Sequence, residues 1–139
     1  MVDGAKVNPL EPTEAEVAKL FPDGWPNASE LIALILEDVF LCGGTCTVSR
    51  RGDWWIVSSS KDWLVDDSIP AIDLFHRIVA APRVGPNAVR SEYVVTRSSV
   101  HVATSTDDGW QVVIGELDDA LRTFEPSVRD TRRSIAFRV

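Results

Sequence analysis

Four consecutive large apolar residues, Trp54 to Val57, constrain the fold of this chain more than any other stretch. They follow Arg51-Gly52, a dipeptide typical of a tight turn, so residues 44–60 are predicted to form a β-hairpin. Because side chains alternate between the two faces of a strand, Trp54 and Trp55 are expected on opposite faces. The hairpin therefore needs cover on both sides.

Helix signals lie on the N-terminal side of this hairpin. The sequence Thr13-Glu14-Ala15-Glu16 fits a capping box, in which the threonine and the second glutamate bond reciprocally. A second helix starts at residues 27–30 and ends at Gly43-Gly44. It is apolar around most of its circumference, which is typical of a helix buried on more than one side. Its acidic residues are expected on the exposed side: Glu30, Glu37 and Asp38.

Periodicity and turn residues predict the remaining elements. A third helix is capped by Asp67 or Ser68 and has Pro70 in its first turn, and a fourth covers residues 117–124. Strands are predicted at residues 92–97, 99–104, 110–114 and 135–139, with a hairpin loop at residues 105–109. The order α-α-β-β-α-β-β-β-α-β indicates an α+β fold, with a mostly antiparallel sheet of about five to six strands and helices packed on one face.

The length of 139 residues is that of one domain, residues 1–139, with residues 1–12 expected to form a flexible arm. The start of the chain lacks a secretory signal, and the apolar stretch at residues 31–41 is too short and too charged to span a bilayer. A cytoplasmic location is therefore expected.

The net charge of −7 is unevenly distributed along the chain. Residues 1–75 hold thirteen acidic and five basic residues, whereas the remainder holds eight and nine. An acidic protein is a poor binder of nucleic acid or of an anionic membrane, but it suits a basic protein partner. The plainer interpretation is that the charge keeps a small protein in solution.

The cysteines and histidines form no recognisable metal or redox motif. Cys42 and Cys46 are separated by three residues rather than the two of thioredoxin-type motifs. The intervening glycines make a disulfide physically feasible, but free cysteines acting as small apolar residues are expected. His76 and His101 complete a Cys2His2 set without the spacing of zinc sites. No metal and no cofactor is therefore expected.

Two groups of residues are candidates for binding another protein. Tryptophan is strongly enriched at binding hot spots, and the first group combines tryptophans with nearby acids: Trp54, Trp55, Trp63, Asp62, Asp66 and Asp67. The second is a basic patch whose guanidinium groups suit carboxylates or phosphates: Arg129, Arg132 and Arg133. That patch has an alternative role, which is to balance the protein's own acidic half within the fold or across a homodimer.

Two functions are consistent with these features of the sequence. The first is a non-catalytic protein-interaction module, such as an adaptor, a chaperone-like protein or an immunity or inhibitor-like protein; in size and charge the chain is similar to secretion chaperones and immunity proteins. The second is a small-molecule-binding protein or a small enzyme, because the element order resembles cone-shaped α+β folds that bind ligands between a curved sheet and its helices. The pocket would then be lined by Trp55, Asp73, His76 and His101, with the aspartate beside the histidine for acid–base chemistry.

Overall fold

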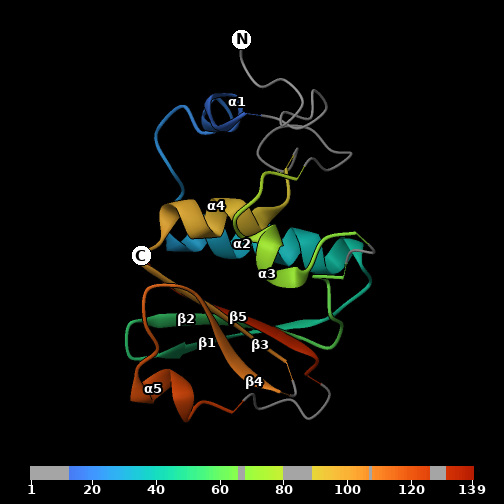
Figure 1. Ribbon diagram of the computed structural model, residues 1–139, viewed down its shortest axis with the longest axis vertical. Coiled ribbons are helices and arrows are strands. Elements are labelled where there is room, and N and C mark those ends of the chain that lie inside the picture. The colour runs from blue at the N-terminus through green and yellow to red at the C-terminus, as the bar shows by residue number, and fades with distance from the viewer. Residues whose placement is uncertain (1–12, 66–67, 80–88, 107, 126–130) are drawn as a thin grey trace.

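The computed structural model describes residues 13–65, 68–79, 89–106, 108–125 and 131–139 (Figure 1). Its helices are α1 (Glu14–Ala18), α2 (Ala28–Leu41), α3 (Ala71–Leu74), α4 (Ser91–Ser98) and α5 (Asp119–Arg122). Its strands are β1 (Cys46–Arg51), β2 (Trp54–Ser59), β3 (His101–Thr106), β4 (Gly109–Ile114) and β5 (Arg133–Arg138). The expected arm at residues 1–12 lies outside the described residues.

The five strands form one antiparallel sheet in the order β1-β2-β5-β3-β4. Two hairpins, β1-β2 and β3-β4, flank β5, which pairs with β2 on one side and β3 on the other. The predicted α+β class, with a mostly antiparallel sheet of about five strands, is confirmed. The last strand of the chain is thus the centre of the sheet.

The predicted first hairpin is confirmed, with its turn one residue later than expected. Arg51 pairs with Trp54, so Gly52-Asp53 forms the two-residue loop. Gly52 has a φ of +58°, a left-handed conformation that glycine adopts without strain and that tight hairpin turns require. The two tryptophans lie on opposite faces: Trp54 is fully buried on one and Trp55 is half-buried on the other.

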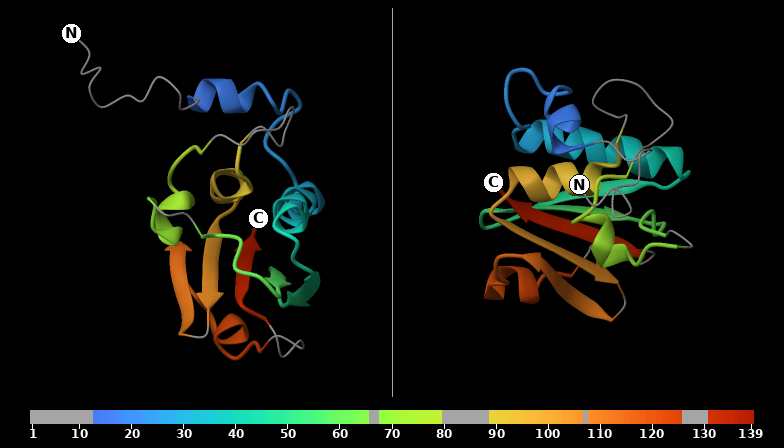
Figure 2. Two further views of the ribbon diagram at one scale, coloured as in Figure 1. Left: turned by 90° about the vertical axis from the view of Figure 1, so that its right-hand side faces the viewer. Right: turned by 45° about the horizontal axis from the view of Figure 1, so that its top comes forward.

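Helices cover the sheet on both sides. Figure 2 shows α2 and α4 on one side and α5 on the other. On the first side, residues of alternate strand positions such as Val57, Ile135 and Phe137 share a core with α2 and α4. On the second side, Leu121 and Phe124 cover a smaller cluster: Trp54, Ile56, Ala103 and Ala136. The prediction that helices pack on one face therefore holds for α2 and α4, whereas α5 supplies the second cover.

Residues 92–97 were predicted as a strand, and this is wrong because they belong to α4. The expected exposure of Asp38 is also wrong, because its side chain binds the start of the same helix. This α2 side chain is buried, and its Oδ2 accepts hydrogen bonds from the backbone N–H (2.9 Å) and the hydroxyl (2.6 Å) of Ser91. Asp38 thereby satisfies donors at the start of α4, where the N-cap residue Arg90 offers no side-chain bond.

The first two helices begin as predicted. Thr13 with Glu16, and Asn27 with Glu30, each form a complete capping box. The third helix has only four residues, and its predicted start is wrong, because Pro70 rather than Ser68 is the N-cap residue; Asp67 lies outside the described residues. None of the described helices is long and apolar enough to cross a bilayer. Figure 1 shows α1 above α4 and α2, on the side of the helices away from the sheet.

Candidate functional site

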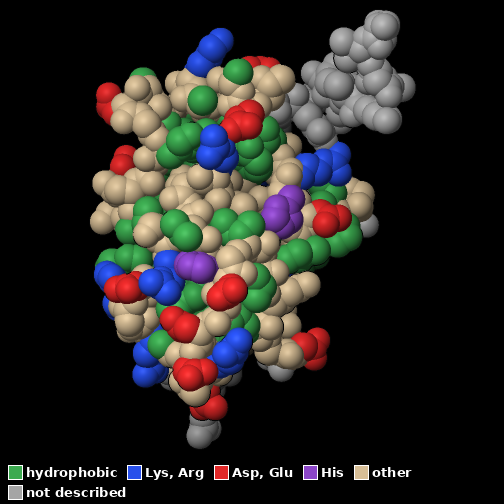
Figure 3. All heavy atoms as spheres, turned by 60° about the vertical axis from the view of Figure 1, so that its left-hand side comes forward, with side chains coloured by type: hydrophobic (Ala, Val, Ile, Leu, Met, Phe, Trp, Pro, Cys, Tyr) green, Lys and Arg blue, Asp and Glu red, His purple; other side chains and the backbone are tan. Residues whose placement is uncertain are grey.

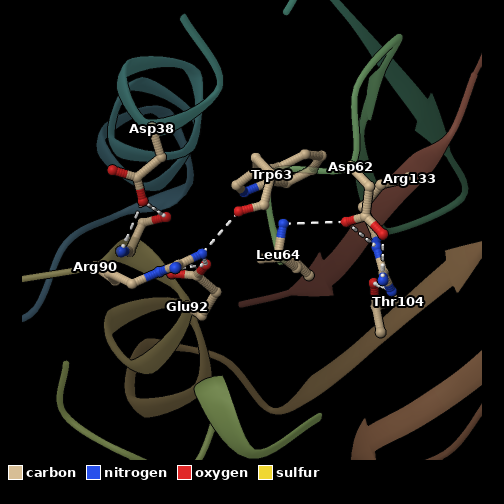
Figure 4. Close-up of polar contacts among 9 residues, drawn as sticks. Asp38, Asp62, Trp63, Leu64, Arg90, Glu92, Thr104 and Arg133 are labelled. Atoms are coloured by element: carbon tan, nitrogen blue, oxygen red, sulfur yellow. Dashed lines mark hydrogen bonds and ion pairs between the residues drawn. The ribbon is translucent and has the colours of Figure 1, made fainter. Parts of the chain in front are cut away.

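Two predicted binding residues, Asp62 and Arg133, bind each other (Figure 4). The guanidinium donates from Nε and Nη2 to the two carboxylate oxygens at 2.9 and 2.8 Å, and Nη1 donates to Thr104 at 3.2 Å. The Arg133 side chain is 8 % exposed and that of Asp62 is 30 % exposed, so the guanidinium of this bidentate pair is withdrawn from solvent and the carboxylate is partly open to it. Arg133 of the predicted basic patch therefore neutralises an acidic residue of the N-terminal half within the fold.

Trp63 belongs to a second polar network at the start of α4. Its carbonyl accepts a hydrogen bond from Arg90 Nη2 at 2.8 Å, and the same guanidinium pairs with the fully buried Glu92 at 2.7 Å (Figure 4). Burial raises the pKa of the Glu92 carboxyl, and the charge of Arg90 partly opposes that rise. The Trp63 ring is buried as well. The segment at residues 62–64 therefore fastens β5 to α4.

The other two predicted tryptophans differ in exposure. Trp54 is fully buried under α5, with the His101 ring centroid 6.0 Å away. Trp55 is half-buried, and the guanidinium of Arg50 lies 4.1 Å from its ring centroid. Cation–π contacts of this kind at partly exposed positions are modest in strength. Of the three tryptophans, Trp55 alone keeps a part of its surface for a partner.

Of the remaining residues of the two predicted binding groups, the structure describes only Arg132. Arg132 is exposed, and its backbone N–H donates to the Ser59 carbonyl at 2.8 Å. Asp66, Asp67 and Arg129 lie outside the described residues. The predicted binding role of these residues stays a prediction.

The structure does not bring the alternative pocket residues together. Asp73 and His76 are both exposed on or beside α3, joined by a backbone hydrogen bond of 3.1 Å. His101, at the start of β3, is half-buried and accepts the backbone N–H of Glu116 at Nδ1, 2.9 Å away. Figure 3 shows both histidines on one face of the molecule, separated by other side chains.

The two cysteines are free in the structure. Cys42 is exposed at the end of α2, and Cys46 is half-buried in β1. Burial raises the pKa of the Cys46 thiol to about 11, so almost none of it is thiolate at neutral pH. Among the described residues, no group of three or more His, Cys, Asp or Glu side chains is placed to hold a metal ion.

An open groove lies elsewhere, between α2 and the link that follows α1. Its volume is about 420 Å³. The apolar lining comes from both walls: Leu20, Phe21, Pro22, Ala33 and Leu34. The polar lining comes from Gly24 and three carboxylates: Asp23, Glu30 and Glu37. We call this the α1–α2 groove; it combines an apolar floor with an acidic rim.

The wall of the groove that is formed by the link after α1 is anchored to the rest of the fold. Val17 of α1 is fully buried in the main core, which contributes about 1.5–2 kcal/mol relative to leaving it exposed. In the link, the rings of Phe21 and Trp25 are in contact, with centroids 5.8 Å apart. Arg97 of α4 pairs with Glu14 at 2.6 Å, but both side chains are about half exposed, so this ion pair adds little. Apolar burial therefore holds the wall in place.

The groove residues were not among the sites predicted from the sequence. A partial signal was present, because Glu30, Ala33 and Glu37 recur at helical spacing and share one face of α2. The predicted exposure of both glutamates is confirmed. The other wall depends on how Leu20 and Phe21 fold back toward that face, and no local pattern encodes this.

Comparisons of the chain with protein-family models, with curated proteins and with solved structures found no match. The groove is therefore interpreted from its own geometry and charge.

Proposed function

We propose that the protein is a non-catalytic interaction module that holds a segment of another protein in the α1–α2 groove. The observation that carries this proposal is the combination of an apolar floor with three carboxylates at an open surface. Apolar burial supplies affinity for a polypeptide, and the charges at the edge select its sequence. The acidic N-terminal half of the chain points to the same kind of partner.

The shape of the groove favours a polypeptide over an enclosed small molecule. Six of its nine lining residues are exposed, and Leu20 and Phe21 are half-buried. Sites for drug-sized ligands usually bury 70–90 % of the ligand surface. A shallow groove meets that requirement poorly, but it can hold one stretch of a chain whose remainder lies across the surrounding surface.

Selection from a library of random peptides displayed on phage tests this function. Peptides enriched on the wild-type protein are expected to shift the amide resonances of residues 20–24 and 30–37 in heteronuclear NMR spectra. They are also expected to bind the Ala33→Trp variant at least tenfold more weakly, because the indole fills the groove. Thr123→Trp, which places the same side chain at an exposed position of the opposite side, is the matched control.

Two results count against the proposal. One is a selection without binders from a diverse library. The other is a set of binders whose resonance shifts avoid the groove and whose affinity is equal for Ala33→Trp and Thr123→Trp. The shifts are measured on the wild-type protein, so the conclusion does not depend on the folding of a variant.

A further inference from the structure

The charge and spacing of the groove residues specify the partner segment more closely, and this step rests on the proposed function. We infer that the α1–α2 groove takes an extended segment with two lysine or arginine residues three positions apart and apolar residues between them. The three carboxylates, the helical spacing of two of them and the apolar floor of the groove each support part of this assignment.

The charges at the groove lack partners of opposite sign among the described residues. Elsewhere, carboxylates such as Asp62, Glu92 and Asp53 pair with arginines at 2.7–3.2 Å. Asp23 and Glu37 make no ion pair within the described part of the chain, and neither Lys nor Arg lines the groove. A segment that brings two cations therefore neutralises a charge that the fold leaves uncompensated.

The spacing of the cations follows from helix geometry. Glu30 and Glu37 lie seven positions apart on one face of α2, which is roughly 10 Å along the helix axis. Glu30 uses Oε1 for the N–H of Asn27, which leaves Oε2 for a partner cation. In an extended chain, residues three positions apart are about 9–10 Å apart, and the polyproline II form places them on the same side.

An extended segment fits both the rim and the floor of the groove. It places its two apolar side chains on Leu20, Phe21 and Leu34 while its cations reach the carboxylates at the rim. Its repeat of about 9–10 Å over three residues matches the distance between the two glutamates along α2.

Synthetic peptides with the sequence Gly-Ser-Lys-Phe-Leu-Lys-Ser-Gly, and their counterparts with Gln or Glu in place of both lysines, test the inference. In NMR titrations at low salt, the lysine peptide is expected to bind about tenfold more tightly than the glutamine peptide, because two exposed ion pairs are gained. The advantage should shrink as salt is raised toward about 0.5 M, where screening is strong. The glutamate peptide should bind most weakly.

Charge-reversed variants separate the groove from the net charge of the protein. The double variant Asp23→Lys/Glu37→Lys is expected to prefer the glutamate peptide over the lysine peptide. The control Glu116→Lys/Glu125→Lys carries the same net charge change at exposed positions that flank α5, and it should keep the wild-type preference. Equal weakening in both double variants would mean that binding reflects net charge alone, and the inference would be wrong.

The outcomes distinguish this inference from the proposed function. If lysine and glutamine peptides bind the groove equally well, the cationic assignment fails while the interaction function stands. If a peptide with its lysines one position apart binds as tightly as the first, the spacing fails. If no peptide and no library member shifts the groove resonances, the proposed function fails as well.

Discussion

Asp38 connects two helices that are far apart in the sequence. Its carboxylate lies near the end of α2 and accepts both donors of Ser91, the first residue of α4. A carboxylate at a helix N-terminus is also favoured by the helix dipole. One buried acid therefore performs, from another element, the capping function that the residue before α4 does not provide.

Replacement of Asp38 by alanine is expected to lower the free energy of unfolding by about 1–3 kcal/mol. Two buried donors of Ser91 then lose their acceptor, and unmade buried hydrogen bonds are costly. Asp38→Asn keeps one acceptor oxygen and should lose less. Urea unfolding followed by tryptophan fluorescence measures the effect. Glu37→Ala, at the exposed neighbouring position, should leave the midpoint unchanged, and equal effects of Glu37→Ala and Asp38→Ala would contradict this role.

Glu92 makes the stability of the folded protein depend on pH. Burial raises the pKa of this carboxyl above its value in the unfolded chain, so the folded state holds the proton more tightly. Its contribution to stability is then fully present below the unfolded pKa, about 4.3, and is lost as the pH rises through the folded pKa. Glu92→Gln removes this ionisation while it preserves the shape of the side chain.

As the pH rises, the free energy of unfolding of the Glu92→Gln variant is therefore expected to increase relative to that of the wild type. Near pH 4 the two proteins should be similarly stable, and the difference should grow toward pH 8. Urea midpoints measured across this range provide the comparison, with Glu125→Gln as a control at an exposed acid. Parallel curves for the wild type and Glu92→Gln would show that Glu92 does not couple folding to protonation.

At the scale of elements, local sequence is sufficient where the partners are neighbours in the chain. Both capping boxes, both hairpins and the final strand follow from motifs of a few residues. The β-branched pair in α4, Val94-Val95, favours a strand by propensity, but both side chains are buried in a helix whose first residue is capped by Asp38. Because Asp38 is 53 residues away from Ser91, the sequence around α4 contains no pattern that reveals this cap.

The candidate site shows the same limit. Tryptophan, aspartate and arginine were identified as binding residues by their type, yet Trp54 and Trp63 are core residues and Asp62 is paired with Arg133 across 71 positions. Residue type predicts which side chains form strong interactions, but not whether those interactions are internal. The groove arises where α2 meets the link that follows α1, so its residues become a site only in three dimensions.

The short helix α5 buries the second face of the sheet, and this burial is expected to be essential for the stability of the protein. Leu121 is fully buried against the cluster that contains Trp54 and Ala136, so Leu121→Ala should destabilise the protein by about 2–5 kcal/mol. Arg122→Ala on the same helix removes an exposed side chain with a long ion pair and should have no measurable effect. Thermal or urea unfolding compares them. Equal stability of both variants would show that this face needs no helix.

At the scale of the whole molecule, β5 is the element on which the sheet depends. The β1-β2 hairpin and the β3-β4 hairpin each pair with β5, and the sheet order places it between them. Ile135, Ala136 and Phe137 are all fully buried, and they belong to the clusters on both faces. Each of the two large side chains contributes roughly 1.5–3 kcal/mol by burial, whereas a typical domain is stable by only about 5–15 kcal/mol.

A chain that ends at Arg132 is therefore expected to lack a cooperative unfolding transition. Loss of β5 removes two sets of strand pairs together with the burial of Ile135 and Phe137, and that loss rivals the whole stability of a domain this size. A chain that ends at Arg138 lacks only the exposed Val139 and should unfold like the wild type. Urea titrations followed by circular dichroism and tryptophan fluorescence measure both chains. If the shorter chain unfolded cooperatively at the wild-type midpoint, the two hairpins would have to associate directly, and β5 would be an addition to the sheet rather than its centre.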